Sequence, residues 1–173
     1  TIRPGSAPFE GLAKALVPLI ERHCSDDLVQ TWAESLRRGE RSLADLLNQR
    51  HSSVLEVPRV LLIIDQFEEL YTLCPDPNIR THFIDTLLEG SRKPDSNALP
   101  GPSAPSPHLP IASLQSPCSI LLTLRADFMG KVLTYRPLAD ALQTDVIVLG
   151  AMNGTELARA IEFPAGTLGI SFE

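Results

Sequence analysis

The sequence predicts a three-layer α/β domain in which helices flank a mostly parallel sheet, and two observations support this fold class. Short apolar runs such as Val60–Ile64 show no alternation of polar and apolar residues, which is typical of strands buried on both faces of a parallel sheet. These runs alternate along the chain with stretches in which apolar residues recur every three or four positions, the spacing of an amphipathic helix. At 173 residues, the chain is long enough for one domain of ordinary size.

Helical spacing and capping signals predict three helices in the first third of the chain. Ser6 is the expected N-cap of the first helix and Ser42 that of the third. Pro18 should kink or shorten the first helix, because its ring removes a backbone donor. In order, the predicted elements are a short strand over residues 1–4, a helix that begins near Pro8, a helix over Asp27–Arg38 and a short helix that ends near Arg50.

The remainder of the chain contains the apolar runs that predict the sheet, together with one segment of a different kind. Residues 92–118 include seven prolines among 27 residues, and we predict that they form an extended, disordered insertion. The other predicted elements are strands over Arg59–Ile64, Ser119–Leu124 and Asp145–Leu149, and helices over Asn78–Glu89, over Pro137–Leu142 and from a capping box at Asn153 and Glu156 to Pro164.

Composition argues against several classes of protein. The net charge of -6 and the isoelectric point near 5.2 argue against nucleic-acid binding, because such proteins usually carry a basic face. The three cysteines lack the pairing and spacing of a disulfide framework or zinc site, which predicts reduced thiols and a cytoplasmic location. No apolar run approaches the ~20 residues needed to span a bilayer, so we expect no membrane segment here.

Polar residues follow two of the predicted strands. Asp65 comes directly after Ile64, and Arg125 comes directly after Leu124. The carboxyl ends of parallel strands form the edge at which ligands bind, and there an acid can hold Mg²⁺ through water while an arginine contacts a phosphate oxygen. This pair indicates a phosphoryl-transfer site. A structural role is also compatible with the pattern, in which Asp65 caps the next helix with Glu68 at the third position.

Four stretches are informative when taken together: TIRPGSAPFEGLAKAL, LLIIDQFEELYTLC, LLTLRADFMGKVLTYRPLADAL and VLGAMNGTELARAIEFPA. Together they resemble the novel STAND NTPase domain of large bacterial signalling proteins, which is often joined to WD repeats. The first stretch resembles the segment after the P-loop helix of that family, and the resemblance covers almost the whole chain except the proline-rich insertion. The resemblance implies a P-loop NTPase-like (ASCE/STAND) fold over residues 1–173, with residues 150–173 beginning a C-terminal helical lid.

The resemblance also implies roles for individual residues. Asp65 matches the Walker B aspartate, which would hold Mg²⁺ through water. Glu68 and Glu69 match the acidic pair, one of which would polarise the attacking water. Thr123 and Arg125 match the segment that senses the nucleotide phosphates. The implied cofactors are Mg²⁺ and ATP or GTP.

Two neighbouring residues complete this part of the resemblance. Gln66 occupies the place where many related ATPases have an acidic base, so the assignment of the base to one of the two glutamates stays open. Asp127, close to the expected phosphate sensor, is expected to be a structural helix cap.

One motif of the family is not found in these residues. A P-loop NTPase binds phosphates with G-x-x-x-x-G-K-[ST], whereas Gly130 and Lys131 form the one Gly-Lys pair here and are followed by Val132. We expect that the chain is truncated at its N-terminal core strand and that the motif lies upstream of Thr1. The alternative is a copy that has lost its P-loop.

These observations support two functional hypotheses. The first is a nucleotide-dependent regulatory or assembly switch, part of an ATP or GTP hydrolase that self-associates and acts with WD repeats or an effector domain. The second is a non-catalytic interaction module with the same fold. We expect the isolated 173 residues to be inactive and weakly stable, because a missing central strand leaves strand edges unpaired.

Overall fold

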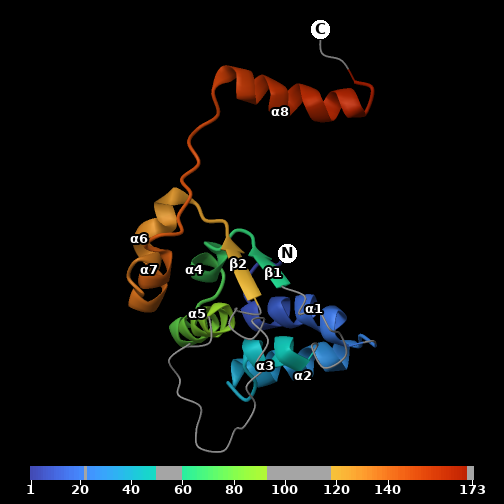
Figure 1. Ribbon diagram of the computed structural model, residues 1–173, viewed down its shortest axis with the longest axis vertical. Helices are drawn as coiled ribbons and strands as arrows, with labels where there is room; N and C mark the ends of the chain where they lie inside the picture. The colour runs from blue at the N-terminus through green and yellow to red at the C-terminus, as the bar shows by residue number, and fades with distance from the viewer. Residues whose placement is uncertain (22, 50–59, 93–117, 171–173) are drawn as a thin grey trace, which may run out of the picture. The chain divides into compact units, whose positions relative to one another are not determined.

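The computed structural model describes residues 1–21, 23–49, 60–92 and 118–170 (Figure 1). They form two compact units, Thr1–Ala141 and Leu142–Glu173. The proline-rich insertion predicted over residues 92–118 lies outside the described residues, apart from its two ends.

Two parallel strands form the sheet of the first unit. β1 (Val60–Ile64) pairs with β2 (Cys118–Leu122) in a register that places Ile64 opposite Leu122. Ile2 forms an isolated parallel bridge to Ile64, so the predicted N-terminal strand is present as one bridged residue. Ile2 bonds to the backbone of residues 63 and 65, whereas Ile64 bonds to Thr123, so β1 lies between Ile2 and β2.

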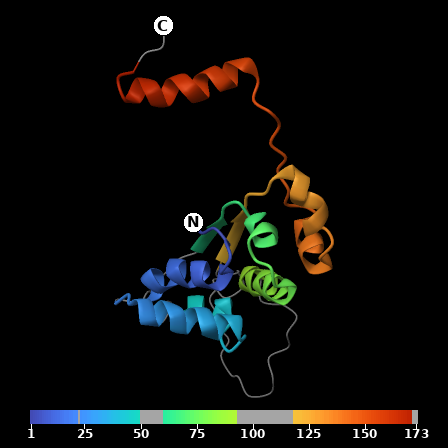
Figure 2. The same cartoon turned by 180° about the vertical axis from the view of Figure 1, so that it is seen from behind.

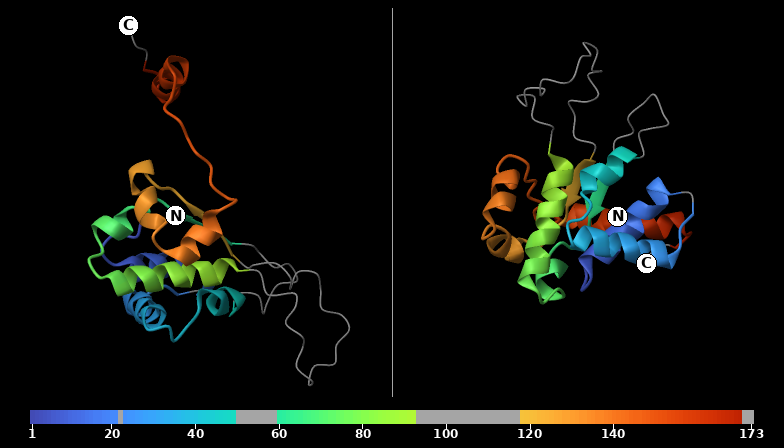
Figure 3. Two further views of the ribbon diagram at one scale, coloured as in Figure 1. Left: turned by 90° about the vertical axis from the view of Figure 1, so that its left-hand side faces the viewer. Right: turned by 90° about the horizontal axis from the view of Figure 1, so that it is seen from below.

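Five helices of the described residues precede β2 in the first unit. In the left view of Figure 3, α1 and α5 lie on one side of the sheet, with α2 and α3 beyond them. Figure 2 shows α1 and α2 packed along each other. Their bounds are α1 (Pro8–Ile20), α2 (Asp26–Arg37), α3 (Leu43–Gln49), α4 (Glu69–Thr72) and α5 (Pro77–Ser91).

The core of this unit lies between the helices and one face of the sheet. Phe9 of α1 contacts Phe83 of α5 edge to face, with ring centroids 5.4 Å apart. Both rings are buried, and burial of such a side chain stabilises the fold by about 1.5–3 kcal/mol. Other fully buried side chains of the core are Leu12, Leu16, Leu36, Leu43, Leu46, Leu47, Ile64, Phe67 and Leu70.

The second face of the sheet is only partly covered by the described residues. Leu62 and Ile64 are buried, but Leu61 is 61% exposed and Leu121 is 48% exposed. In the described residues the predicted burial of the strands on both faces is therefore met only in part, because α1, α2, α3 and α5 gather on one side of the sheet (Figure 3).

The helix caps agree with the sequence in part. The N-cap of α1 is Ala7 and not Ser6, and no side chain caps it; Pro8 occupies the first turn, where its missing N–H costs nothing. The predicted cap at Ser42 is confirmed, because its hydroxyl accepts a 3.0 Å hydrogen bond from the Asp45 N–H. Pro18 lies in the last turn of α1, which ends two residues later at Ile20.

Three short helical elements follow β2: the 3₁₀ helix η3 (Ala126–Phe128), α6 (Met129–Val132) and α7 (Arg136–Leu142). Val132 and Leu138 are buried. Between them, the Tyr135 hydroxyl donates a 2.5 Å hydrogen bond to Asp85 of α5. This contact and the buried side chains tie the segment after β2 to the helical layer.

The second unit contains α8 (Gly154–Thr167). Its predicted capping box is confirmed, since Asn153 accepts from the Glu156 N–H at 3.0 Å and Glu156 accepts from the Asn153 N–H at 2.9 Å. The predicted stop at Pro164 is wrong, because the helix continues to Thr167. None of the described helices is long and apolar enough to cross a membrane.

The strand predicted over Asp145–Leu149 is also wrong. Residues 145–150 form no regular secondary structure. Ile147, Val148 and Leu149 are 85%, 85% and 89% exposed. A strand requires a neighbour to complete its backbone hydrogen bonds, and in the described part of the chain only β1 and β2 form a ladder.

Candidate functional site

The ends of β1 and β2 are joined by a side-chain hydrogen bond. Thr123 lies directly after β2, and its hydroxyl donates to Oδ1 of Asp65, directly after β1, at 2.7 Å. The same hydroxyl oxygen accepts the Gln66 N–H at 2.9 Å. The parallel register sets these residues side by side, because Ile64 and Leu122 are partners. The structure thus brings together the expected metal residue and one expected phosphate sensor.

The chain turns sharply at Gln66. This residue has φ of 56°, a left-handed conformation that costs a non-glycine residue about 1–2 kcal/mol. The turn is held by two bonds to Thr123, one from the Gln66 N–H to the hydroxyl and one from the Phe67 N–H to the carbonyl at 2.9 Å. A strained residue held by its surroundings is a frequent feature of functional sites.

Asp65 is held in its charged form. The hydrogen bond from Thr123 is the main cause that lowers the pKa of the Asp65 carboxyl below its usual value, and partial burial opposes this shift. The charge and hydrogen bond of Arg3 also lower the pKa. The side chain of Asp65 is 34% exposed. The site therefore presents an accessible anion at neutral pH.

Arg3 is a site residue that sequence reasoning missed. Its Nη2 lies 3.4 Å from Oδ2 of Asp65, and its side chain is 60% exposed. Backbone bonds from Ile2 to the chain on either side of Ile64 place Arg3 beside Asp65. The predicted strand over residues 1–4 contained the signal, because a strand beside β1 would carry its next residue to the same edge.

The two glutamates each accept a backbone N–H from a different segment. Oε2 of Glu68 accepts from the Arg125 N–H at 3.4 Å. Oε2 of Glu69 accepts from the Gly5 N–H at 3.2 Å. The structural alternative for Asp65 is wrong, because the N-cap residue of α4 is Glu68 and no side chain caps this helix. All three acids therefore connect the turn after β1 to neighbouring segments.

Arg125 places its guanidinium on a nearby acid. Its Nε donates to Oδ1 of Asp127 at 3.1 Å and its Nη2 to Oδ2 at 2.9 Å. The expectation that Asp127 is a helix cap is wrong, because η3 has Arg125 as its N-cap residue and shows no side-chain cap bond. The contact of Arg125 with the turn after β1 is made by its backbone N–H, which donates to the Glu68 carboxylate.

The donor atoms at this edge fit Mg²⁺ held largely by water. The carboxylate of Asp65 and the hydroxyl of Thr123 are oxygen donors, which Mg²⁺ prefers, and this ion commonly uses one or two carboxylates with several waters. Within the described residues, no group of three or more His, Cys, Asp or Glu side chains could hold a metal. The arrangement is thus suited to an ion shared with a ligand rather than enclosed by protein.

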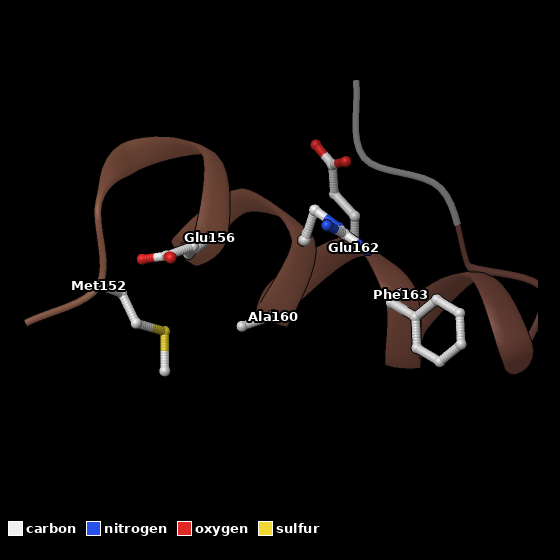
Figure 4. Close-up of a pocket in the computed structure, with 6 residues that line it drawn as sticks. Met152, Glu156, Ala160, Glu162 and Phe163 are labelled. Atoms are coloured by element: carbon white, nitrogen blue, oxygen red, sulfur yellow. The ribbon is translucent and has the colours of Figure 1, made fainter. Parts of the chain in front are cut away.

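A hollow lies on the second unit and contains none of the expected site residues. Figure 4 shows Met152, Ala160 and Phe163 pointing to one side of α8, with Glu156 and Glu162 at its margins. The expected site residues all belong to the first unit.

Helices combined with a parallel strand pair make this an α/β protein. The family model for Novel STAND NTPase 1 matches residues 1–173. The chain therefore belongs to the Novel STAND NTPase 1 family. No curated protein and no solved structure matches the chain at a significant level.

Proposed function

We propose that the chain is the nucleotide-binding part of a STAND-type signalling NTPase with a three-layer P-loop fold. The observation that carries the proposal is the 2.7 Å hydrogen bond from Thr123 to Asp65, which joins the carboxyl ends of the two parallel strands. This edge is where open parallel sheets bind ligands, and family membership gives the ligand class as nucleotide.

Each site residue has a proposed role. Bound Mg²⁺ would neutralise charge on the nucleotide phosphates. Asp65, kept anionic by Thr123, holds this ion through water. Glu68 or Glu69 orients the attacking water by accepting its proton. Arg125 contacts the terminal phosphate, and its backbone bond to Glu68 couples that contact to the acidic turn.

The nucleotide would act as a regulatory signal in a cytoplasmic bacterial protein that also carries WD repeats or an effector domain. Binding and slow hydrolysis would control self-association or output, as in switches biased by a terminal phosphate. Residues 150–173 would begin the C-terminal lid, to which α8 belongs.

The test measures ATP and GTP hydrolysis by the longest natural chain that contains these residues. Asp65→Asn and Arg125→Ala should each lower kcat by about 10²–10³, the effect of removing one transition-state stabiliser. Arg136→Ala is the matched control, because it removes another arginine that pairs with an aspartate, Asp140, in α7. Undiminished hydrolysis in both site variants contradicts the proposal.

The non-catalytic interaction module makes the opposite prediction for the same protein. Failure of that chain to bind labelled ATP and GTP with Mg²⁺ present, at high micromolar concentration, favours the module over the switch. Nucleotide binding that persists in Asp65→Asn and does not depend on Mg²⁺ also counts against the proposed site.

A further inference from the structure

Arg3 pairs with the one carboxylate that the proposed function assigns to the metal. Ile2 donates its N–H to the Ile63 carbonyl and accepts the Asp65 N–H, both at 2.8 Å, so the backbone sets Arg3 at the edge of the site. From there its guanidinium reaches Oδ2 of Asp65, the oxygen that Thr123 leaves free. In the described residues, the positive charge beside Asp65 is therefore the guanidinium of Arg3, which comes from the N-terminal segment.

The segment that carries Arg3 is attached to the acidic turn at two points. The Arg3 side chain contacts Asp65, and two residues later the Gly5 N–H contacts Glu69. Gly5 has φ of 56°, which glycine adopts without strain. Both contacts use carboxylates of the proposed nucleotide site.

A guanidinium and a divalent cation cannot share one carboxylate oxygen at low cost, because like charges a few ångströms apart repel strongly. The other proposed cationic residue, Arg125, is already paired with Asp127. Arg3 is thus the group that a metal ion must displace from Asp65. The pair is exposed, so displacement costs little.

We propose that Arg3 is an internal counter-ion of Asp65, which occupies the carboxylate in the absence of Mg²⁺ and lowers the affinity of the site for the free metal ion. The inference rests on the proposed function, because it takes Asp65 as the metal residue. Its consequence is that a free metal ion must compete with Arg3 for Asp65.

The test uses Mn²⁺ alone as the probe and measures its dissociation constant by electron paramagnetic resonance on the natural chain without nucleotide. Arg3→Ala and Arg3→Gln should each tighten Mn²⁺ binding by about two- to five-fold, the range set by an exposed ion pair. Arg136→Ala removes the same charge from the pair with Asp140 and should leave Mn²⁺ affinity unchanged. Asp65→Asn should abolish binding.

The outcomes separate this inference from the function on which it rests. Equal or weaker Mn²⁺ binding in both Arg3 variants, with binding still lost in Asp65→Asn, overturns the role of Arg3 and leaves the proposed site intact. Binding that is unchanged in Asp65→Asn overturns both. A tightening in Arg136→Ala as large as in the Arg3 variants also overturns the inference, because net charge alone would then explain it.

Discussion

Thr123 donates a 2.7 Å hydrogen bond to the carboxylate of Asp65, although the two residues lie 58 positions apart in the sequence. The same hydroxyl accepts the N–H of Gln66, so one side chain fixes both the acid and the turn that follows it. The proposed metal residue is therefore oriented from the neighbouring strand.

Thr123→Val should raise the pKa of Asp65 toward its usual value, because the main cause of the lowered pKa is the hydrogen bond from the Thr123 hydroxyl. Thr123→Ser keeps the hydroxyl and is the matched control. NMR titration of the Asp65 carboxyl group measures the shift. An unchanged pKa in Thr123→Val would show that Arg3 or the backbone sets the charge state instead.

The same contact should make stability depend on pH in the acid range. Since the folded pKa of Asp65 is lowered, its stabilising effect is present above the unfolded pKa of about 3.9 and is lost as the pH falls through the folded value. The stability difference between the wild type and Thr123→Val should therefore grow as pH rises to about 5 and stay constant above it. Urea unfolding at a series of pH values measures this, and a difference independent of pH contradicts it.

Gln66→Gly should stabilise the turn after β1, because glycine adopts a φ of 56° without the penalty that a side chain imposes. The expected gain is about 0.5 kcal/mol after the greater freedom of glycine in the unfolded chain is subtracted. Gln66→Val should instead cost about 1–2 kcal/mol. Urea unfolding compares the two variants, and equal stabilities would show that the turn is not strained.

Gly90→Ala should destabilise the packing of α5 on α3. A Cβ at this position would lie 2.4 Å from Cδ2 and 3.2 Å from Cβ of Leu43, which is fully buried. Overpacking of this kind costs about 1–3 kcal/mol. Hydrogen exchange of the α5 amides should report the loss.

Two further variants control for the effect of Gly90→Ala. Gly130→Ala in α6 meets no atom within 4 Å and should be neutral or stabilising. In a Leu43→Ala background the cost of Gly90→Ala should largely disappear, because the clash is removed. An equal cost in both backgrounds would assign the effect to something other than Leu43.

Asp85→Asn should return the pKa of Tyr135 toward its usual value of about 10. The hydrogen bond to the Asp85 carboxylate is the main cause that raises the pKa of Tyr135 to about 12. Because the folded pKa is raised, the stabilising effect is complete below pH ~10 and is lost as pH rises through the folded value. Ultraviolet titration measures the pKa of the Tyr135 phenol, and Tyr135→Phe assigns the signal. A pKa that stays raised in Asp85→Asn contradicts the prediction.

Local patterns in the sequence predicted most of the helices and two of the strands, but not which apolar runs find a partner strand. Val60–Ile64 is a run of five apolar residues before Asp65, and it is a strand because it pairs with β2. Asp145–Leu149 has a similar pattern but pairs with no strand in the described residues, so propensity alone misled. Pairing depends on residues far away in the chain, which a local pattern does not contain.

The site residues also divide into those that a local pattern predicts and those whose position depends on other contacts. Asp65 and Thr123 could be selected because each follows an apolar run, and parallel strands bring such positions together. Arg3 was missed because its position depends on a single bridge at Ile2, and the pairing of Arg125 with Asp127 was missed because the residues are two apart in an irregular segment. Side-chain partners within a loop follow from backbone angles that residue types do not specify.

The most direct test of the nucleotide site is to map where its metal ion binds. Fe²⁺ with ATP, ascorbate and peroxide can replace Mg²⁺ and cleave the chain next to the bound ion. In the natural chain, we expect cleavage at residues 3–5, 64–69 and 122–126 that requires ATP and is lost in Asp65→Asn. Cleavage confined to other segments, or cleavage at these segments that persists in Asp65→Asn, would contradict the assignment of this edge as the nucleotide site.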